Sequence, residues 1–169
     1  MGLEFLKILI VDDTARTRTL LAEILRAIGI RQIHEANDGA EGMKLMQTQA
    51  IDVVVTDLAM VPLDGVSFVR RLRTSPGSPN PTIPVLMITG HSTVQHIQEA
   101  RDAGATAFMA KPITAGGLIG RLQQVIDDRR PFVRGDDYFG PDRRRARDPD
   151  HHGPWRRAVD GPTVRAIRG

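Results

Sequence analysis

The 169 residues are enough for one domain with a hydrophobic core and too few for two domains of ordinary size. The absence of cysteine excludes disulfides, thiolate metal sites and cysteine nucleophiles, and no apolar run approaches the roughly 18 residues of a membrane span. The net charge of +3 is uneven, because residues 129–169 carry 11 Arg and 6 Asp while residues 1–128 have a net charge of −2.

Five apolar runs of strand length alternate along the chain with segments of helical periodicity. The runs span Lys7–Val11, Arg31–Ala36, Ile51–Asp57, Pro84–Thr89 and Thr106–Ala110. Helical patterns follow them at about residues 20–28, from Gly39, and at 66–73, 93–103 and 115–128, with Asp38 as an expected N-cap. This alternation predicts an α/β fold, a doubly wound parallel sheet of five strands with helices on both faces.

Polar side chains stand at the carboxyl ends of four of these runs. They are Asp12 and Asp13 after the first, Asp57 at the end of the third, Thr89 at the end of the fourth and Lys111 after the fifth. Because the carboxyl ends of parallel strands share one edge of the sheet, we expect these side chains to converge. Three carboxylates at a buried edge raise one another's pKa unless a cation joins them, and oxygen ligands suit Mg²⁺. An ammonium and a hydroxyl beside a carboxylate nucleophile fit phosphoryl transfer.

Several short motifs resemble those of response regulator receiver domains, the chemotaxis-regulator-like domains of two-component signalling. They are Asp12-Asp13, the run Asp57-Leu-Ala-Met-Val-Pro-Leu-Asp-Gly65, Thr89-Gly90 and Lys111-Pro112. The resemblance covers residues 7–128 and implies a flavodoxin-like sheet of strand order 2-1-3-4-5. One departure is that Pro62 lies one place later than the proline usual in the family.

The resemblance also implies which residues accept the phosphoryl group and bind the metal. Asp57 would accept a phosphoryl group from a histidine kinase or a phosphotransfer protein. Asp13 would bind Mg²⁺ directly, Asp12 mainly through water, and Ala59 through its backbone carbonyl.

Three further residues would complete the switch of such a domain. Lys111 would pair with the Asp57 carboxylate and then with the phosphate, and Thr89 would turn its hydroxyl toward the phosphoryl oxygens. Phe108 matches the family's switch aromatic, and a plain core role for this residue is equally well supported. The implied protein signals by contact with a downstream protein or a second copy of itself, and it is not an enzyme that turns over a metabolite.

Other interpretations of these acids are weaker. Taken singly, Asp12-Asp13 suits a helix cap and Asp57 a turn, and only their expected convergence with Thr89 and Lys111 favours a site. A phosphatase with an aspartyl nucleophile would need a general acid at position 59, where alanine stands. No secretory pattern occurs in residues 1–6, so we expect a cytoplasmic protein without membrane contact.

The remaining segments are rich in proline, glycine and charge. Residues 75–84 contain four prolines and are expected to form a stiff surface loop. Residues 129–169 predict a basic tail, irregular or ordered only on binding, after a receiver domain at 1–128. Its aromatics Phe132, Tyr138, Phe139 and Trp155 suggest that the tail docks on a partner protein or on a second copy of the chain. The face around Phe108 is the other surface through which we expect a homodimer. Nucleic-acid binding by the tail is the less favoured alternative, because six Asp are interspersed among its arginines.

Overall fold

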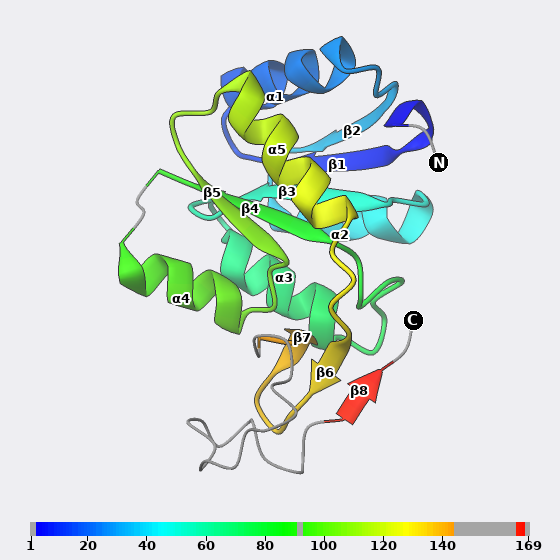
Figure 1. Ribbon diagram of the computed structural model, residues 1–169, viewed down its shortest axis with the longest axis vertical. Coiled ribbons are helices and arrows are strands. Elements are labelled where there is room, and N and C mark those ends of the chain that lie inside the picture. Colours follow the sequence, from blue (N-terminus) through cyan, green and yellow to red (C-terminus); the bar gives the residue numbers. More distant parts are fainter. Residues whose placement is uncertain (1–2, 91–92, 144–164, 168–169) are drawn as a thin grey trace, which may run out of the picture.

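The computed structural model describes residues 3–90 and 93–143 and a short strand at 165–167. Its centre is a parallel sheet of five strands in the order β2-β1-β3-β4-β5 (Figure 1). The strands are β1 (Lys7–Val11), β2 (Gln32–Ala36), β3 (Val53–Asp57), β4 (Val85–Thr89) and β5 (Ala107–Ala110). The predicted doubly wound architecture and the strand order 2-1-3-4-5 are confirmed.

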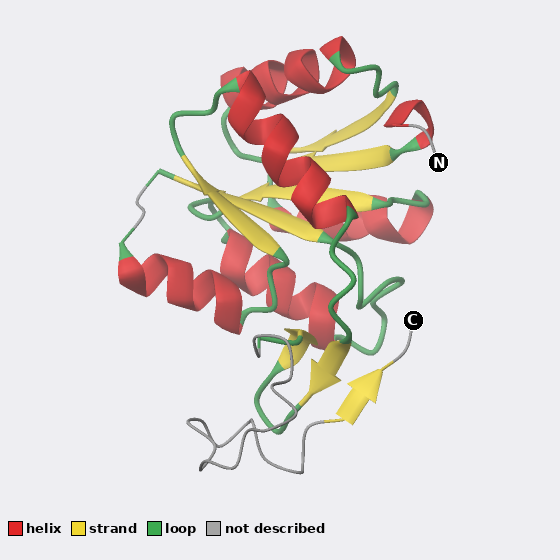
Figure 2. Cartoon of the chain, viewed as in Figure 1, coloured by secondary structure: helices red, strands yellow, loops and turns green. Residues whose placement is uncertain are grey.

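Helices cover both faces of this sheet (Figure 2). They are α1 (Ala15–Ala27), α2 (Gly39–Thr48), α3 (Gly65–Thr74), α4 (Val94–Asp102) and α5 (Ala115–Ile126), preceded by a short 3-10 helix at Leu3–Phe5. Asp38 caps α2 as predicted, since its carboxylate accepts hydrogen bonds from the backbone N–H groups of Ala40 and Glu41. Among the described residues, no helix combines the length and the apolar character needed to cross a membrane.

Alternate residues of the buried strands face two separate hydrophobic clusters. Ile8 and Ile10 of β1 pack in a cluster with α1 and α5, whereas Leu9 and Val11 pack in a second cluster with α2, α3 and α4. The sheet is therefore buried on both faces, and only its edges reach solvent. The carboxyl edge is where β1, β3, β4 and β5 deliver the polar residues of the predicted site.

The expectation of an irregular tail is wrong for residues 132–141. Phe132–Arg134 (β6) and Phe139–Pro141 (β7) pair as antiparallel strands, and Arg165–Ile167 (β8) pairs with the other side of β6. Val133, Tyr138 and Phe139 are buried. The composition of the tail gave no sign of this order, because the order depends on contacts between the hairpin and distant residues such as Arg73 and Gly104 as well as on contacts within the hairpin.

The β6–β7 hairpin packs at the amino ends of β4 and β5, opposite the carboxyl edge. A Cβ atom on Gly104, in the turn before β5, would lie 2.6 Å from the backbone oxygen of Phe139. Gly104 also has a φ of +96°, a conformation that favours glycine. Tyr138 and Phe139, two of the aromatics expected to dock on a partner, are buried within the chain, and Trp155 lies outside the described residues.

Arg73 of α3 joins the hairpin to the proline-rich loop. Its side chain is buried, its Nε donates to the Gly104 backbone oxygen at 3.1 Å, and its Nη1 donates to the Pro81 oxygen at 2.8 Å. The guanidinium also lies 4.9 Å from the centre of the Phe132 ring. Burial lowers the pKa of Arg73, because the charged form loses hydration inside the protein.

Candidate functional site

Three carboxylates meet at the carboxyl edge of the sheet, as the sequence predicted. Asp12, Asp13 and Asp57 each offer one oxygen, and these oxygens all lie within 4.8 Å of one another. Asp12 and Asp57 are only 1% and 6% exposed, whereas Asp13 faces solvent. The cluster is therefore a partly enclosed acidic pocket with one open side.

Asp12 is oriented by its neighbours in the turn between β1 and α1. Its Oδ1 accepts a hydrogen bond of 2.8 Å from the Thr14 backbone N–H, and its backbone oxygen accepts one of 2.7 Å from Arg18. Thr14 occupies the N-cap position of α1, so the two acids precede the cap and do not serve as it. Burial raises the pKa of Asp12, and the charges of Asp57 and Asp13 raise it further.

Lys111 supplies the positive charge of the pocket. Its Nζ lies 3.1 Å from Asp57 Oδ1 and 3.9 Å from Asp12 Oδ2. The closer contact is an ion pair, and within the described residues the buried Asp57 Oδ1 accepts no hydrogen bond. This oxygen therefore lies beside a positive charge inside the pocket.

The backbone around Asp57 is packed tightly against the start of α3. A Cβ atom on Gly65 would lie 2.1 Å from the Asp57 backbone oxygen, so only glycine fits there. The same oxygen accepts a 3.1 Å hydrogen bond from the Thr56 hydroxyl, and the Leu58 oxygen accepts one of 2.9 Å from the Gly65 N–H. Gly65 ends the motif that begins at Asp57, but no local sequence pattern reveals its contact with the Asp57 backbone.

Thr89 and Lys111 stand on adjacent strand ends beside Asp57. Asp57 pairs in register with Ile88, and the Lys111 N–H donates to the Thr89 backbone oxygen at 2.8 Å. Thr89 is buried at 3% exposure. These contacts fix the ends of β3, β4 and β5 relative to one another.

The other two predicted residues lie outside the carboxylate cluster. Ala59 is exposed in the bend two residues after Asp57. Phe108 is half-buried on β5, pairs in register with Met87 and packs against the cluster under α2, α3 and α4. Its surroundings fit both the core role and the switch role considered from the sequence.

The donor set fits a small hard cation. Three carboxylates within 4.8 Å supply oxygen ligands, and no hydrogen-bond donor among the described residues occupies the buried Asp57 Oδ1. A divalent ion would offset both the burial and the carboxylate repulsion that raise the pKa of Asp12. The pocket can therefore hold Mg²⁺ beside the Asp57 carboxylate.

Comparisons with known proteins agree with this geometry. The family model for the response regulator receiver domain matches residues 8–123. A "Probable chemotaxis protein CheY" of Rhizobium etli is 37% identical over 123 residues, which are 73% of this chain and 94% of that protein. The chemotaxis protein CheY-3 of Vibrio cholerae is 33% identical over 122 residues, or 72% of this chain and 92% of that protein.

Solved structures show the same fold. The chemotaxis response regulator CheY4 of Vibrio cholerae superposes with a TM-score of 0.65 at 31% identity, covering 71% of this chain and 98% of that one. These relatives match nearly in full, so the C-terminal part of this chain has no counterpart in them. The chain belongs to the response regulator receiver domain family.

Proposed function

We propose that this protein is a phosphorylation-switched signalling protein whose acceptor is Asp57. The observation that carries the proposal is the position of Asp57 Oδ1, which is buried, lies 3.1 Å from the Lys111 ammonium and accepts no hydrogen bond from any residue that the structure describes. A carboxylate oxygen held in this way can serve as a nucleophile. Membership of the receiver family supports the same reaction.

The proposed donor is a phosphohistidine on a histidine kinase or a phosphotransfer protein. One Asp57 oxygen attacks phosphorus, the P–N bond breaks, and its electron pair stays on the imidazole nitrogen, which takes up a proton. Lys111 then balances charge on the phosphoryl oxygens, and the Thr89 hydroxyl donates to one of them. Attack of water on phosphorus later releases inorganic phosphate and restores the carboxylate, so the protein modifies itself and turns over no metabolite.

Mg²⁺ would be held by Asp13 and Asp57 directly, by Asp12 through water and by the Ala59 backbone carbonyl. An ion held by these residues would supply positive charge that offsets the charge of the phosphoryl oxygens. The acid cluster within 4.8 Å supports this assignment for the three carboxylates.

The proposed output is a change in protein contact around Phe108. This residue lies on the strand that leads to Lys111, and it is half-buried, so a change at the pocket can alter its exposure. The partner is a downstream protein or a second copy of the chain. Residues 1–128 would act as the receiver, and residues 129–169 as an extension that assists contact with the partner.

Labelling with a small donor tests the acceptor. The full chain is incubated with acetyl phosphate and Mg²⁺, and intact mass and peptide mapping locate the added phosphoryl group. We expect one group on Asp57, none on the Asp57→Asn variant, and unchanged labelling of Asp136→Asn, which alters an exposed acid in the hairpin turn. Equal labelling of the Asp57→Asn protein would refute the assignment.

A further inference from the structure

A second polar cavity lies away from the acidic pocket, where α4, β5 and α5 meet the start of the C-terminal extension. Its volume is about 430 Å³, and Phe108 and Thr106 of the β5 region line it. Five arginines line it as well, namely Arg101, Arg121, Arg129, Arg130 and Arg143, against two carboxylates, Asp127 and Asp128. The lining therefore has a clear excess of positive charge.

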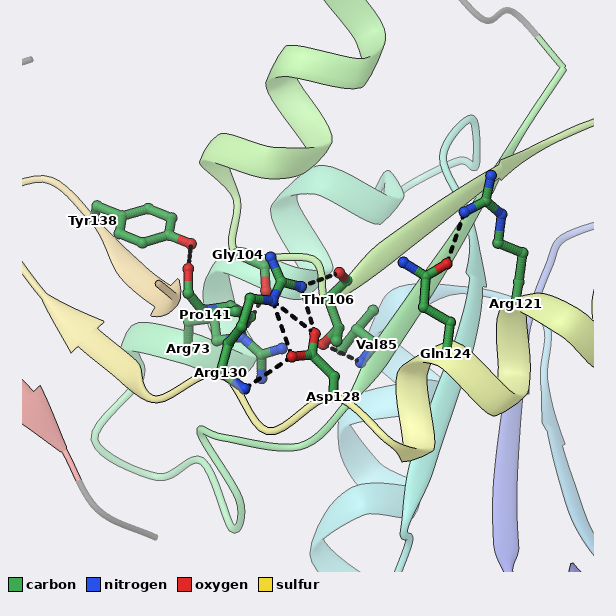
Figure 3. A network of polar contacts seen from close by, with 10 residues as sticks. All are labelled: Arg73, Val85, Gly104, Thr106, Arg121, Gln124, Asp128, Arg130, Tyr138 and Pro141. Carbon is green, nitrogen blue, oxygen red and sulfur yellow. Dashed lines mark hydrogen bonds and ion pairs between the residues drawn. The ribbon is translucent and has the colours of Figure 1, made fainter. Parts of the chain in front are cut away.

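Two of these arginines are held in place by polar contacts. Arg130 donates from Nη2 to the Thr106 backbone oxygen at 2.7 Å and pairs with Asp128, as Figure 3 shows. Arg143 pairs with Asp102 at the end of α4, and its guanidinium lies 3.8 Å from the centre of the Tyr138 ring. Arginines held in this way lose little conformational freedom when a ligand binds.

The charges of the other three arginines are not neutralised by a carboxylate of the described residues. Within residues 3–90 and 93–143, Arg101, Arg121 and Arg129 form no ion pair. Arg121 donates to the neutral Gln124 side chain at 2.7 Å, also visible in Figure 3, so its charge is oriented without being neutralised. The three exposed side chains come from α4, α5 and the start of the extension and surround the same cavity.

We propose that this cavity binds a small anion that carries two or more phosphate groups. Guanidinium groups present paired N–H donors that match phosphate oxygens, and several of them around one cavity fit several such groups. The volume falls within the range of small-ligand sites, and the Phe108 ring adds an apolar surface. Three of the five arginines lie after residue 128, so the site depends on the extension; it shares Phe108 with the output face proposed above but includes none of the residues of the acidic pocket.

Isothermal titration of the full-length protein with inorganic tripolyphosphate tests this site. The measurement omits Mg²⁺ and any phosphoryl donor, so its result does not depend on Asp57. We expect saturable binding of one anion per chain, weakened about tenfold by Arg101→Gln and by Arg129→Gln, since each loses a charged hydrogen-bond donor. Arg31→Gln is the matched control, because it removes the same charge from an exposed residue between α1 and β2.

The titrations separate this proposal from its alternatives. Binding that is absent, or that weakens equally in the Arg31→Gln control, would show only general attraction to a basic chain and would overturn the site. Binding unaffected by Arg101→Gln and Arg129→Gln would overturn it too, because other arginines of the extension would then hold the anion. A hexaglutamate peptide is titrated in parallel, and binding as tight as that of tripolyphosphate would replace the phosphate ligand by an acidic protein segment.

Discussion

The Lys111 ammonium lies 3.1 Å from Asp57 Oδ1, a buried oxygen that accepts no hydrogen bond from the described part of the chain. The two side chains form an ion pair inside the pocket. The backbone on either side is fixed, because the Lys111 N–H donates to the Thr89 oxygen and Gly65 packs on the Asp57 oxygen. This arrangement fixes the position of the Asp57 carboxylate beside the lysine.

Replacing this cation should slow phosphorylation more than it weakens the fold. In Lys111→Met, the phosphoryl oxygens lose their ammonium partner, and we expect the labelling rate of Asp57 with acetyl phosphate to fall about 100-fold. Lys44→Met is the matched control, because Lys44 is exposed on α2. An unchanged rate in Lys111→Met would remove the lysine from the proposed reaction.

The repulsion among the acids of the pocket should lower the free energy of unfolding when Mg²⁺ is absent. Asp12→Asn removes a buried charge that Asp57 and Asp13 repel, and the amide oxygen can still accept from the Thr14 N–H. Without Mg²⁺, we expect the free energy of unfolding in urea to rise by about 1 kcal/mol. Addition of Mg²⁺ should stabilise the wild type and stabilise Asp12→Asn less, because the variant keeps the direct ligands but loses the charge that holds a bound water. A variant that Mg²⁺ stabilises as strongly as the wild type would contradict the assignment of Asp12.

The contact of Gly65 with the acceptor backbone gives a separate prediction. In Gly65→Ala, the new Cβ would lie 2.1 Å from the Asp57 backbone oxygen, so β3 or α3 must shift. We expect the free energy of unfolding to fall by about 2 kcal/mol and the labelling of Asp57 to slow. Gly120→Ala in α5 is the control, since its Cβ would meet nothing within 4 Å and should raise helix stability by up to about 1 kcal/mol. Equal effects of the two substitutions would show that the contact is unimportant.

The parts of the fold that the sequence predicted are those set by local pattern. The apolar runs fix the strands, Asp38 fixes the start of α2, and parallel strands bring Asp12, Asp57 and Lys111 to one edge whatever the details of packing. The expected association of these three side chains is found in the ion pairs of Lys111. The roles of Thr89, Ala59 and Phe108 in the reaction remain predictions.

The parts that the sequence did not predict depend on contacts between distant segments. The hairpin at 132–141 is ordered because Phe139 meets Gly104 and Phe132 meets Arg73, and none of these pairs is close in sequence. Arg73 looked like an ordinary charge at the end of a helix, yet it is 1% exposed and bonds to two backbone oxygens. Composition alone cannot detect a segment that buries its apolar surface on a neighbouring domain.

The docking of the hairpin should weaken at alkaline pH, because the Tyr138 phenol ionises there. Burial raises the pKa of this phenol above its usual value of 10.0, and its hydroxyl donates to the Pro141 oxygen at 2.8 Å. Because the folded pKa exceeds the unfolded one, the stabilisation is complete below about pH 10 and is lost as the pH rises through the raised pKa. Tyr138 is the chain's single tyrosine, so phenolate absorbance reports on it alone. We expect a titration midpoint above 10 in buffer and close to 10 in concentrated urea.

The Tyr138→Phe variant separates this group from the other groups that titrate at high pH. It keeps the ring under the Arg143 guanidinium but has no phenolic proton to lose, so its free energy of unfolding should decline less steeply above pH 10 than that of the wild type. The lysines and arginines are the same in both proteins, and the difference between the two curves therefore isolates the phenol. Hydrogen exchange of residues 132–141 should show wild-type amides losing protection over the same pH interval in which the phenol ionises. A native midpoint at or below 10, or parallel stability curves, would mean that the phenol is not held in a buried contact and that the hairpin docks without it.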